Sequence, residues 1–366
     1  MDTSETPQQD PILALPCPSC GSELAYSAEK KLIVCGHCGY NEPVNEAQDR
    51  ILENNLEQAI HKMPFFEPEQ RGLKVMSCQN CGAETIIDIK KVNLTCGFCG
   101  SKKINQDAQR HKYIQPAGII PFQLPEGEAD EKFDKWIKKG WFRPSKLQRL
   151  ASREALHAVY VPFWTFDAQT ESDYSGQAGY HYYETKTVKV GDSFQQKRVQ
   201  KTRWVRKSGH LSHFFDDVMV VAADGIQPKL MKKILPFNLK KLVNYDPRLA
   251  VGWETEVYNI ELDQGYKMAE QDMDAQIRNL VKASIGGDVQ RVHSIQTFKF
   301  DQTFKHILLP IWVCSYMYQN KIYQFAINGQ TGKIKGQKPI SWFKIVGLIL
   351  FITAIILLIV FLQDRL

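Results

Sequence analysis

Four pairs of cysteines decide the first third of this chain: Cys17-Pro18-Ser19-Cys20, Cys35-Gly36-His37-Cys38, Cys78-Gln79-Asn80-Cys81 and Cys96-Gly97-Phe98-Cys99. Two residues separate the cysteines of a pair, fourteen separate the first pair of a set from its second, and the arrangement repeats after 61 residues. A two-residue spacer lets a tight turn aim both sulfurs at one tetrahedral ion, and the fourteen residues supply a hairpin that returns the second pair. The spacing therefore predicts two metal-binding ribbons in tandem.

The chemistry of these sites follows from the number of thiolates. Zinc is the usual ion for four thiolates, so we expect two zinc ions per chain. The predicted ligands are Cys17, Cys20, Cys35, Cys38, Cys78, Cys81, Cys96 and Cys99. Four thiolates leave no position for water or substrate, so both ions are expected to be structural. A redox Cys-x-x-Cys is disfavoured, because redox motifs usually occur singly within a strand–helix–strand unit.

Other residues near the pairs have simpler interpretations. Glycines that tolerate a positive φ lie in or beside the turns, at Gly21, Gly36, Gly39, Gly82, Gly97 and Gly100. His37 is expected at the surface, because Phe98 takes its place in the second ribbon. The ninth cysteine, Cys314, lies among apolar residues and is expected in the core.

The other end of the chain predicts a membrane anchor. The 366 residues are 43% hydrophobic and 23% charged, which excludes a disordered chain and a multi-span membrane protein. Residues 345–362, however, form an uncharged apolar run that would span roughly 27 Å as a helix, close to a hydrocarbon core. Trp342 and Phe343 precede it beside Lys344, as interfacial residues do. We expect a single transmembrane helix; a buried core helix is the alternative.

Flanking charge and the N-terminus predict the compartment. Four lysines precede the apolar run, at Lys333, Lys335, Lys338 and Lys344, whereas Arg365 follows it beside Asp364. Because the positive side faces the cytoplasm, the body is expected there, held at the cytoplasmic membrane. The polar, acidic N-terminus does not resemble a secretory signal, so the cysteines are expected in a reducing compartment. Residues 1–60 carry 3 basic and 10 acidic side chains, which disfavours nucleic-acid binding by charge alone.

Between the ribbons and the anchor we expect an α+β domain with a mainly antiparallel sheet. The predicted division is ribbon 1 at 1–45, a helical linker at 46–72, ribbon 2 at 73–115, the central domain at 116–340 and the anchor at 341–366. Strand-like runs fall at 158–168, 172–183, 185–190, 196–207, 210–222, 293–303, 309–319 and 321–328. Helical patterns fall at 46–63, 129–139, 227–234 and 265–284. The first of these helices is interpreted as a covering helix or a partner-docking surface.

Two segments of the central domain resemble each other. They are Val161-Pro162-Phe163-Trp164 and Leu309-Pro310-Ile311-Trp312. Each is expected to open a strand, because proline is tolerated at a strand start. Duplication and coincidence both remain open as explanations.

Motifs for catalysis are absent from the sequence. Residues 329–333 lack the glycine spacing and the Ser/Thr of a phosphate loop and are expected to form a hairpin turn. His210 and His213 are expected to be a surface pair rather than metal ligands. No hydrolase, metalloprotease or dinucleotide fingerprint occurs, so no catalytic residue is predicted and the chain is not expected to be an enzyme.

A basic stretch in the central domain has three interpretations. It contains Lys186, Lys189, Lys197, Arg198, Lys201, Arg203, Arg206 and Lys207, with Asp192 as the one acid and Phe194 and Trp204 among the charges. It is interpreted as a solvated hairpin, as a contact with anionic lipid, or as a grip on nucleic-acid phosphates.

Several segments together resemble one bacterial family over nearly the whole chain. They are the tandem ribbons, Gly118-Ile119-Ile120-Pro121-Phe122, Trp141-Phe142-Arg143-Pro144, residues 161–168, residues 327–333 and the terminal apolar run. The family is the double zinc-ribbon, single-span membrane protein group of the YdjG type, often labelled primosomal protein N′ (replication factor Y), superfamily II helicase. An ATP-driven helicase needs a Gly-Lys-Ser/Thr phosphate loop, which this sequence lacks.

The resemblance implies a scaffold in envelope stress with SPFH-domain or phage-shock-protein-A-like partners. The leading expectation is thus a membrane-anchored, non-catalytic interaction protein that recruits cytoplasmic partners. The alternative is a membrane-tethered nucleic-acid-binding ribbon protein.

Overall fold

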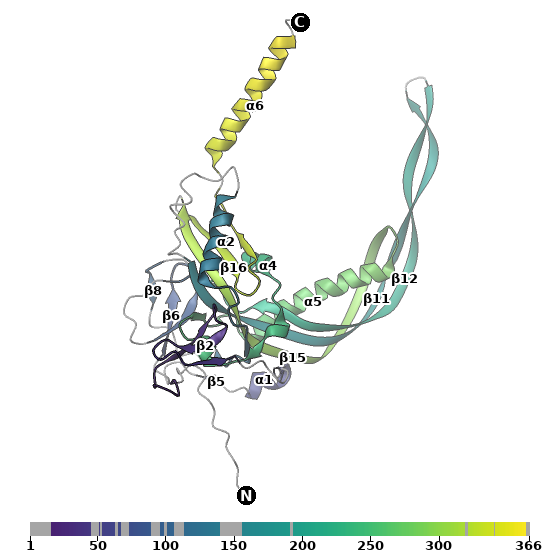
Figure 1. The fold of residues 1–366 in the computed structure, drawn as a ribbon. Helices are drawn as coiled ribbons and strands as arrows, with labels where there is room; N and C mark the ends of the chain where they lie inside the picture. Colours follow the sequence, from purple (N-terminus) through teal and green to yellow (C-terminus); the bar gives the residue numbers. More distant parts are fainter. Residues whose placement is uncertain are drawn as a thin grey trace.

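The structure is a computed structural model that describes residues 16–44, 51, 53–62, 65–66, 73–88, 96–98, 101–105, 113–139, 156–190, 193–318, 321–339 and 341–363. Two cysteine-bearing units are followed by a large, mostly antiparallel sheet with helices, and a long apolar helix comes last (Figure 1). The fold class expected from the sequence is therefore confirmed.

The two cysteine-bearing units are built from short strands. The first contains β1 (Leu24–Ser27), β2 (Leu32–Cys35) and β3 (Asn41–Pro43), in the order β1-β2-β3 and antiparallel. The second contains β6 (Leu73–Cys78), which pairs antiparallel with both β7 (Glu84–Asp88) and β8 (Ile104–Asn105). We call these units ribbon 1 and ribbon 2. Two smaller strands, β5 (Phe65–Phe66) and β9 (Tyr113–Ile114), pair with each other.

Three long strands form the centre of the large sheet. They are β11 (Leu156–Val190), β12 (Ser193–Val221) and β15 (Val289–Tyr318), and β11 lies between the other two with antiparallel pairing on both sides. Shorter strands complete the sheet: β4 (Asn54–Asn55), β10 (Gly118–Ile119), β13 (Val243–Asn244), β14 (Glu254–Glu256), β16 (Lys321–Asn328) and β17 (Ile334–Gly336). The ribbons lie at one end of this body, and the β11–β12 hairpin extends away from it (Figure 1).

The breaks predicted within these strands were wrong. The predicted runs 158–168, 172–183 and 185–190 all belong to the single strand β11. The runs 196–207 and 210–222 belong to β12, which ends at Val221. The runs 293–303 and 309–319 belong to β15, which ends at Tyr318. Two glycines in these strands admit close neighbours: a Cβ on Gly176 would lie 2.5 Å from the Arg291 carbonyl oxygen, and one on Gly209 would lie 2.6 Å from the Tyr174 hydroxyl. These strands continue through their glycines because each is paired along its length.

Helix α5 (Leu262–Ile285) covers one face of the three long strands (Figure 1). It buries Leu262, Gly265, Ala269, Met273, Ile277, Val281 and Ile285, a spacing of three or four residues that places them on one face. A Cβ on Gly265 would lie 2.6 Å from Cδ1 of Trp164, so the glycine lets that indole seat against the helix. The Trp164 indole N–H donates to the Ile260 carbonyl at 2.9 Å, which satisfies its buried polar atom.

The two proline segments lie inside strands rather than at their starts, so that prediction was wrong. Val161 pairs with Leu309, and the two prolines flank this pair symmetrically on β11 and β15. Pro162 lies between the stretch of β11 that pairs with β14 and the stretch that pairs with β12. Pro310 lies likewise on β15 between its pairings with β10 and with β16. Proline is tolerated there because the missing N–H falls at a change of partner strand.

The predicted linker helix is much shorter than 46–63. Among the described residues of that range, helix α1 covers Leu56–Lys62, while Asn54 and Asn55 form β4, which pairs with β15. The Asn55 side chain accepts a hydrogen bond from the Gln58 N–H at 3.0 Å and so caps the helix. The other predicted helices correspond to α2 (Glu126–Lys138), α4 (Pro228–Ile234) and α5.

The last element is helix α6 (Trp342–Gln363), 22 residues long. It is long and apolar enough to cross a membrane, and none of its residues with described side chains is buried. Trp342 and Phe343 at its start are 73% and 92% exposed. The body therefore folds without packing against α6.

Candidate metal centres

Ribbon 1 gathers its four predicted ligands into one cluster. The sulfurs of Cys17, Cys20, Cys35 and Cys38 all lie within 4.8 Å of one another. The Cys17–Cys38 and Cys20–Cys35 sulfur separations are both 3.6 Å. A disulfide needs about 2.05 Å, whereas a tetrahedral ion with Zn–S bonds near 2.3 Å places its sulfurs about 3.8 Å apart. The geometry therefore fits a four-thiolate metal site and not a pair of disulfides.

Ribbon 2 repeats this arrangement with the ligands that are described. Cys78, Cys81 and Cys96 form a second cluster, and the Cys81–Cys96 sulfur separation is again 3.6 Å. The fourth predicted ligand, Cys99, lies outside the described residues. Both predicted groups of ligands thus come together as clusters that can bind a metal ion.

One backbone pattern shapes all four turns. The N–H of the first cysteine of each pair donates to the carbonyl five residues later: Cys17 to Ser22, Cys35 to Tyr40, Cys78 to Ala83 and Cys96 to Ser101. Gly21, Gly39 and Gly82 adopt φ values of 73°, 78° and 79°, which non-glycine residues rarely adopt. Hydrogen bonds from the Ser22 side chain and backbone lower the pKa of Cys20 to about 6, which favours the thiolate form that binds metal.

Ribbon 1 is attached to the central body by its inner face. Cys17 and Cys35 are buried in the same apolar cluster as Ile119 and Phe122, whereas Cys20 and Cys38 are exposed. The Tyr26 hydroxyl donates a 2.9 Å hydrogen bond to the Phe122 carbonyl. Nearby, Arg248 forms ion pairs with Glu42 of ribbon 1 and with Asp246. The outer half of the metal cluster remains accessible to solvent.

Ribbon 2 is continuous with the central sheet. Thr85 and Ile86 of β7 pair antiparallel with Glu256 and Thr255 of β14. Phe98 is fully buried, in one apolar cluster with Cys78 and Cys96 of the ribbon and with residues of α4. The sequence analysis compared Phe98 only with His37 and did not predict that Phe98 packs ribbon 2 against the body. The signal for this packing was an apolar residue between the two cysteines of a pair.

Several other predicted positions are where the sequence suggested. His37 is exposed, and Cys314 is buried, with burial raising the pKa of its thiol to about 12. His210 is an exposed residue that forms ion pairs with Glu171 and Asp173, and no metal-binding group among the described residues contains it. Residues 329–333 form the turn between β16 and β17, where the Asn328 side chain accepts hydrogen bonds from the Gln330 and Thr331 N–H groups. That loop is a hairpin turn, as predicted.

An acidic group at a bulge of the sheet was not anticipated. Asp167, Asp216 and Asp217 lie close enough together to hold an ion. The Lys305 ammonium, itself almost buried, lies 3.6 Å from the Asp167 carboxylate and 2.8 Å from that of Asp217. Lys305 also bonds Glu53 at 3.1 Å, so this lysine offsets part of the acidic charge and links the segment before α1 to the sheet.

A small pocket lined by residues of β14 and β15 was also not anticipated. It has a volume of about 30 Å³, room for about two water molecules, and Glu256 and His306 line it. Oε2 of Glu256 and Nε2 of His306 have no hydrogen-bond partner among the described residues. Burial raises the pKa of Glu256 well above its usual range and lowers the pKa of His306 to about 4, which disfavours the charged form of each group.

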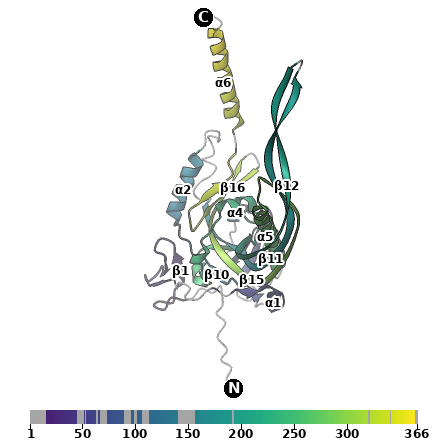
Figure 2. The same cartoon turned by 90° about the vertical axis from the view of Figure 1, so that its right-hand side faces the viewer.

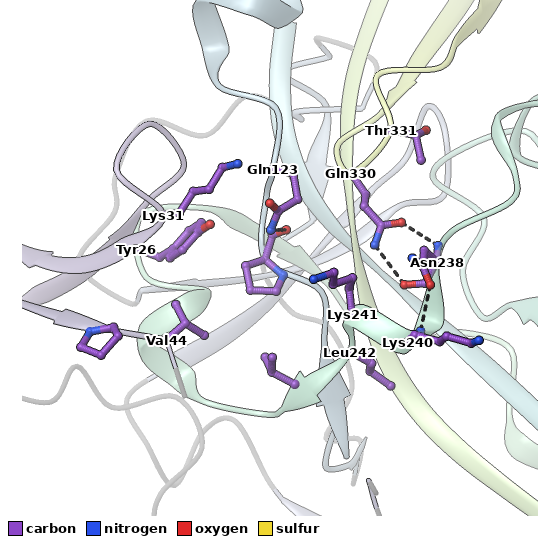
Figure 3. A pocket seen from close by; sticks show the side chains of 13 residues that line it. Tyr26, Lys31, Val44, Gln123, Asn238, Lys240, Lys241, Leu242, Gln330 and Thr331 are labelled. Carbon is purple, nitrogen blue, oxygen red and sulfur yellow. Dashed lines mark hydrogen bonds between the residues drawn. The ribbon is translucent and has the colours of Figure 1, made fainter. Parts of the chain in front are cut away.

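A larger cleft lies between ribbon 1 and the central body (Figure 3). Its volume is about 850 Å³. Lys31 of ribbon 1 lies on one side, and Lys240 and Lys241 of the central body lie across from it (Figure 3). On the same wall, the Gln330 side chain is hydrogen-bonded to the Asn238 backbone at 2.7 and 3.0 Å. No acidic side chain is among the described residues that line the cleft, which favours a neutral or anionic ligand.

The fold and the two cysteine clusters define a zinc-ribbon-like protein whose ribbons are joined to an antiparallel-sheet body, with an apolar helix at its C-terminal end. The chain is a homologue of the uncharacterised protein YdjG of Bacillus subtilis (strain 168), with 28% identity over 337 residues that cover 90% of this chain and 91% of YdjG. This agrees with the resemblance found in the sequence. No family model matches the chain, and no solved structure matches it.

A second similarity is confined to the N-terminal region, which resembles a zinc ribbon. Transcription factor S of Thermococcus celer and that of Thermococcus kodakarensis are each 31% identical to this chain over 75 residues. The matches cover 19% of this chain and 68% of each factor.

Proposed function

We propose that this protein is a membrane-anchored, non-catalytic interaction protein. Two structural zinc ions hold the ribbons in shape, α6 anchors the chain in the cytoplasmic membrane, and the ribbons with the central sheet recruit cytoplasmic protein partners to the bilayer. The observation that carries this proposal is the contrast between ribbons packed into the body and a helix that packs against none of it. Such a chain presents a rigid surface at a membrane.

Zinc is the ion that best suits the ribbons. Only cysteine sulfurs form the two clusters, and soft thiolates with tetrahedral spacing favour zinc over oxygen-binding cations. Ribbon 1 is too small to bury much core by itself, so the ion contributes most of its folding free energy, on the order of 10 kcal/mol. Since the inner cysteines are part of the shared core, the metal also supports the surface offered to partners.

The membrane role rests on the length and exposure of α6. Its 22 residues rise about 33 Å, enough to cross a hydrocarbon core. An apolar helix with no buried side chain is unfavourable in water, because no protein surface covers it. The lysines before the helix favour a body on the cytoplasmic side.

Recruitment is tested by in vivo crosslinking from the exposed side of ribbon 1. A photoreactive residue in place of His37, which is exposed, should form a defined adduct with a protein in the membrane fraction. Cys20→Ser should abolish the adduct, because the ribbon loses its metal, and deletion of residues 342–366 should reduce it. The same probe at Lys229 of α4 serves as a matched exposed control. The proposal would be contradicted if the adduct formed equally well in the Cys20→Ser variant, or if the probe at position 37 formed no adduct.

A second candidate function is favoured by the similarity to transcription factor S. On this hypothesis the ribbons bind nucleic acid at the membrane, and the His37 probe would crosslink to nuclease-sensitive material instead of protein. The acidic balance of residues 1–60 disfavours it, because nucleic-acid phosphates repel carboxylates.

A further inference from the structure

The far part of the β11–β12 hairpin has no third partner among the described residues. β15 follows β11 only as far as the pair Gly179–Val289, and α5 ends at Ile285. Beyond that point residues 180–190 pair with residues 193–203 alone. Eleven residues at about 3.3 Å each make an arm of roughly 36 Å. We call residues 180–190 and 193–203 the hairpin arm.

A two-stranded arm of this kind is at best marginally stable in water, and its side chains suit a different environment. Aromatic rings are exposed along it: Tyr180, Tyr182, Tyr183 and Phe194, with Phe194 73% and Tyr183 58% exposed. Arg198 lies over the Tyr183 ring, 4.9 Å from its centre. Aromatic rings beside cations are the residue types found at the headgroup level of membranes.

The register of the arm concentrates positive charge. Lys186 lies directly opposite Lys197, and like charges at such a position destabilise a sheet. On the same face, Arg203 lies opposite Tyr180 and Lys201 opposite Tyr182. Glu184 pairs with Lys201 and is the one acid among the described residues of the arm. The remaining cations on this face therefore favour an external anion.

The direction in which the arm projects indicates a membrane as its partner. The arm and α6 extend from the same end of the body, and the far part of the arm stands level with α6 rather than below its start (Figure 1 and Figure 2). With α6 across a bilayer and the body in the cytoplasm, an arm that projects the same way as α6 is directed toward the cytoplasmic leaflet (Figure 1 and Figure 2). We propose that the hairpin arm is a second membrane contact, which binds anionic phospholipid headgroups. This inference deepens the proposed function and rests on α6 being the anchor.

The first test uses the body without residues 342–366, which is expected to fold because α6 packs against none of it. Binding is measured by flotation with vesicles of phosphatidylcholine alone or with 30 mol% phosphatidylglycerol, a composition of about one anionic lipid in three. The body should float only with anionic vesicles, and less as salt is raised. Changing Lys186, Lys197, Lys201 and Arg203 to Gln should weaken binding about tenfold or more.

A charge-matched control separates the arm from net charge. Changing the exposed helix lysines Lys229, Lys233, Lys267 and Lys282 to Gln removes the same charge from the surface of α4 and α5. This variant should bind nearly as well as the unchanged body. Equal losses in both variants, or equal flotation with neutral and anionic vesicles, would overturn the proposal. Preference for a DNA duplex over anionic vesicles, lost in the arm variant, would also overturn it in favour of nucleic acid.

The second test uses the full chain in lipid nanodiscs. There α6 holds the protein in the bilayer whether or not the arm binds lipid. Hydrogen exchange of the arm amides should slow severalfold in anionic discs relative to neutral ones, and the arm variant should show no difference. Unchanged exchange would overturn the proposal even with α6 inserted. Failure of the full chain to insert would instead contradict the anchor, so the two failures are distinguishable.

Discussion

The hydroxyl of Tyr26 donates a hydrogen bond of 2.9 Å to the carbonyl of Phe122, and so joins ribbon 1 to the central body. Both residues are buried in one apolar cluster that also contains Cys17 and Cys35. Loss of the metal from ribbon 1 should therefore be felt in the body and not only in the ribbon.

Removing this hydrogen bond should weaken the attachment. Tyr26→Phe keeps the ring but leaves the Phe122 carbonyl without that donor, so the free energy of unfolding should fall by about 1–2 kcal/mol. Urea unfolding measures the change. Tyr183→Phe, at an exposed site of the hairpin arm, should have little effect. Equal effects of the two changes would mean that the Tyr26 bond contributes nothing specific.

The metal content should be two zinc ions per chain. Cys17→Ser and Cys78→Ser should each remove about one ion, because the two clusters are separate closed sites. Cys314→Ala should retain both ions, since Cys314 belongs to neither cluster. Elemental analysis of protein purified under reducing conditions without chelator measures this. A single ion in the unchanged chain would show that one ribbon is not a zinc site.

Stability should fall in mild acid because of His306. Its Nδ1 donates to the Ile114 carbonyl at 2.8 Å, and burial lowers the pKa of the ring to about 4, whereas an unfolded histidine titrates near 6.5. The unfolded chain therefore binds the proton first. The contribution is complete above pH 6.5 and is lost as the pH falls toward 4, at about 1.4 kcal/mol per unit.

A pair of variants isolates this effect from metal loss. His306→Asn can still donate to Ile114 but does not titrate, so its unfolding free energy should change less between pH 7.5 and 5.5 than that of the unchanged chain, with zinc in excess. His293→Asn, at an exposed position, should leave the pH dependence unchanged. Identical pH slopes for the unchanged chain and His306→Asn would refute the assignment to His306.

Local patterns explain which features the sequence predicts well. The cysteine turns depend on residues within about five positions, as the bond from the Cys17 N–H to the Ser22 carbonyl shows. The buried spacing of α5 and the turn at Asn328 are equally local. Such features are determined by neighbours in sequence and need no knowledge of the rest of the fold.

Long-range pairing explains what the sequence does not predict. The joining of ribbon 2 to the sheet depends on Ile86 meeting Thr255, 169 positions away in the chain, and no local pattern specifies that register. The strand breaks predicted at 169–171, 184 and 208–209 do not exist, because β11 and β12 pair with each other across all three positions. The late start of α1 at Leu56 was overlooked because apolar spacing outweighed the Asn55 cap. Glu256 and His306 form one cavity only once β14 and β15 are in place.

The central claim is that α6 holds a folded cytoplasmic body at the membrane. Its most direct test is extraction of cell membranes with alkaline carbonate, which strips proteins held only by charge, including any held by the hairpin arm. The full chain should remain in the pellet, and the chain without residues 342–366 should be released, as should a variant with Ile352→Asp and Ile356→Asp in the span. Release of the full chain by carbonate, or retention of the truncated chain, would contradict the account.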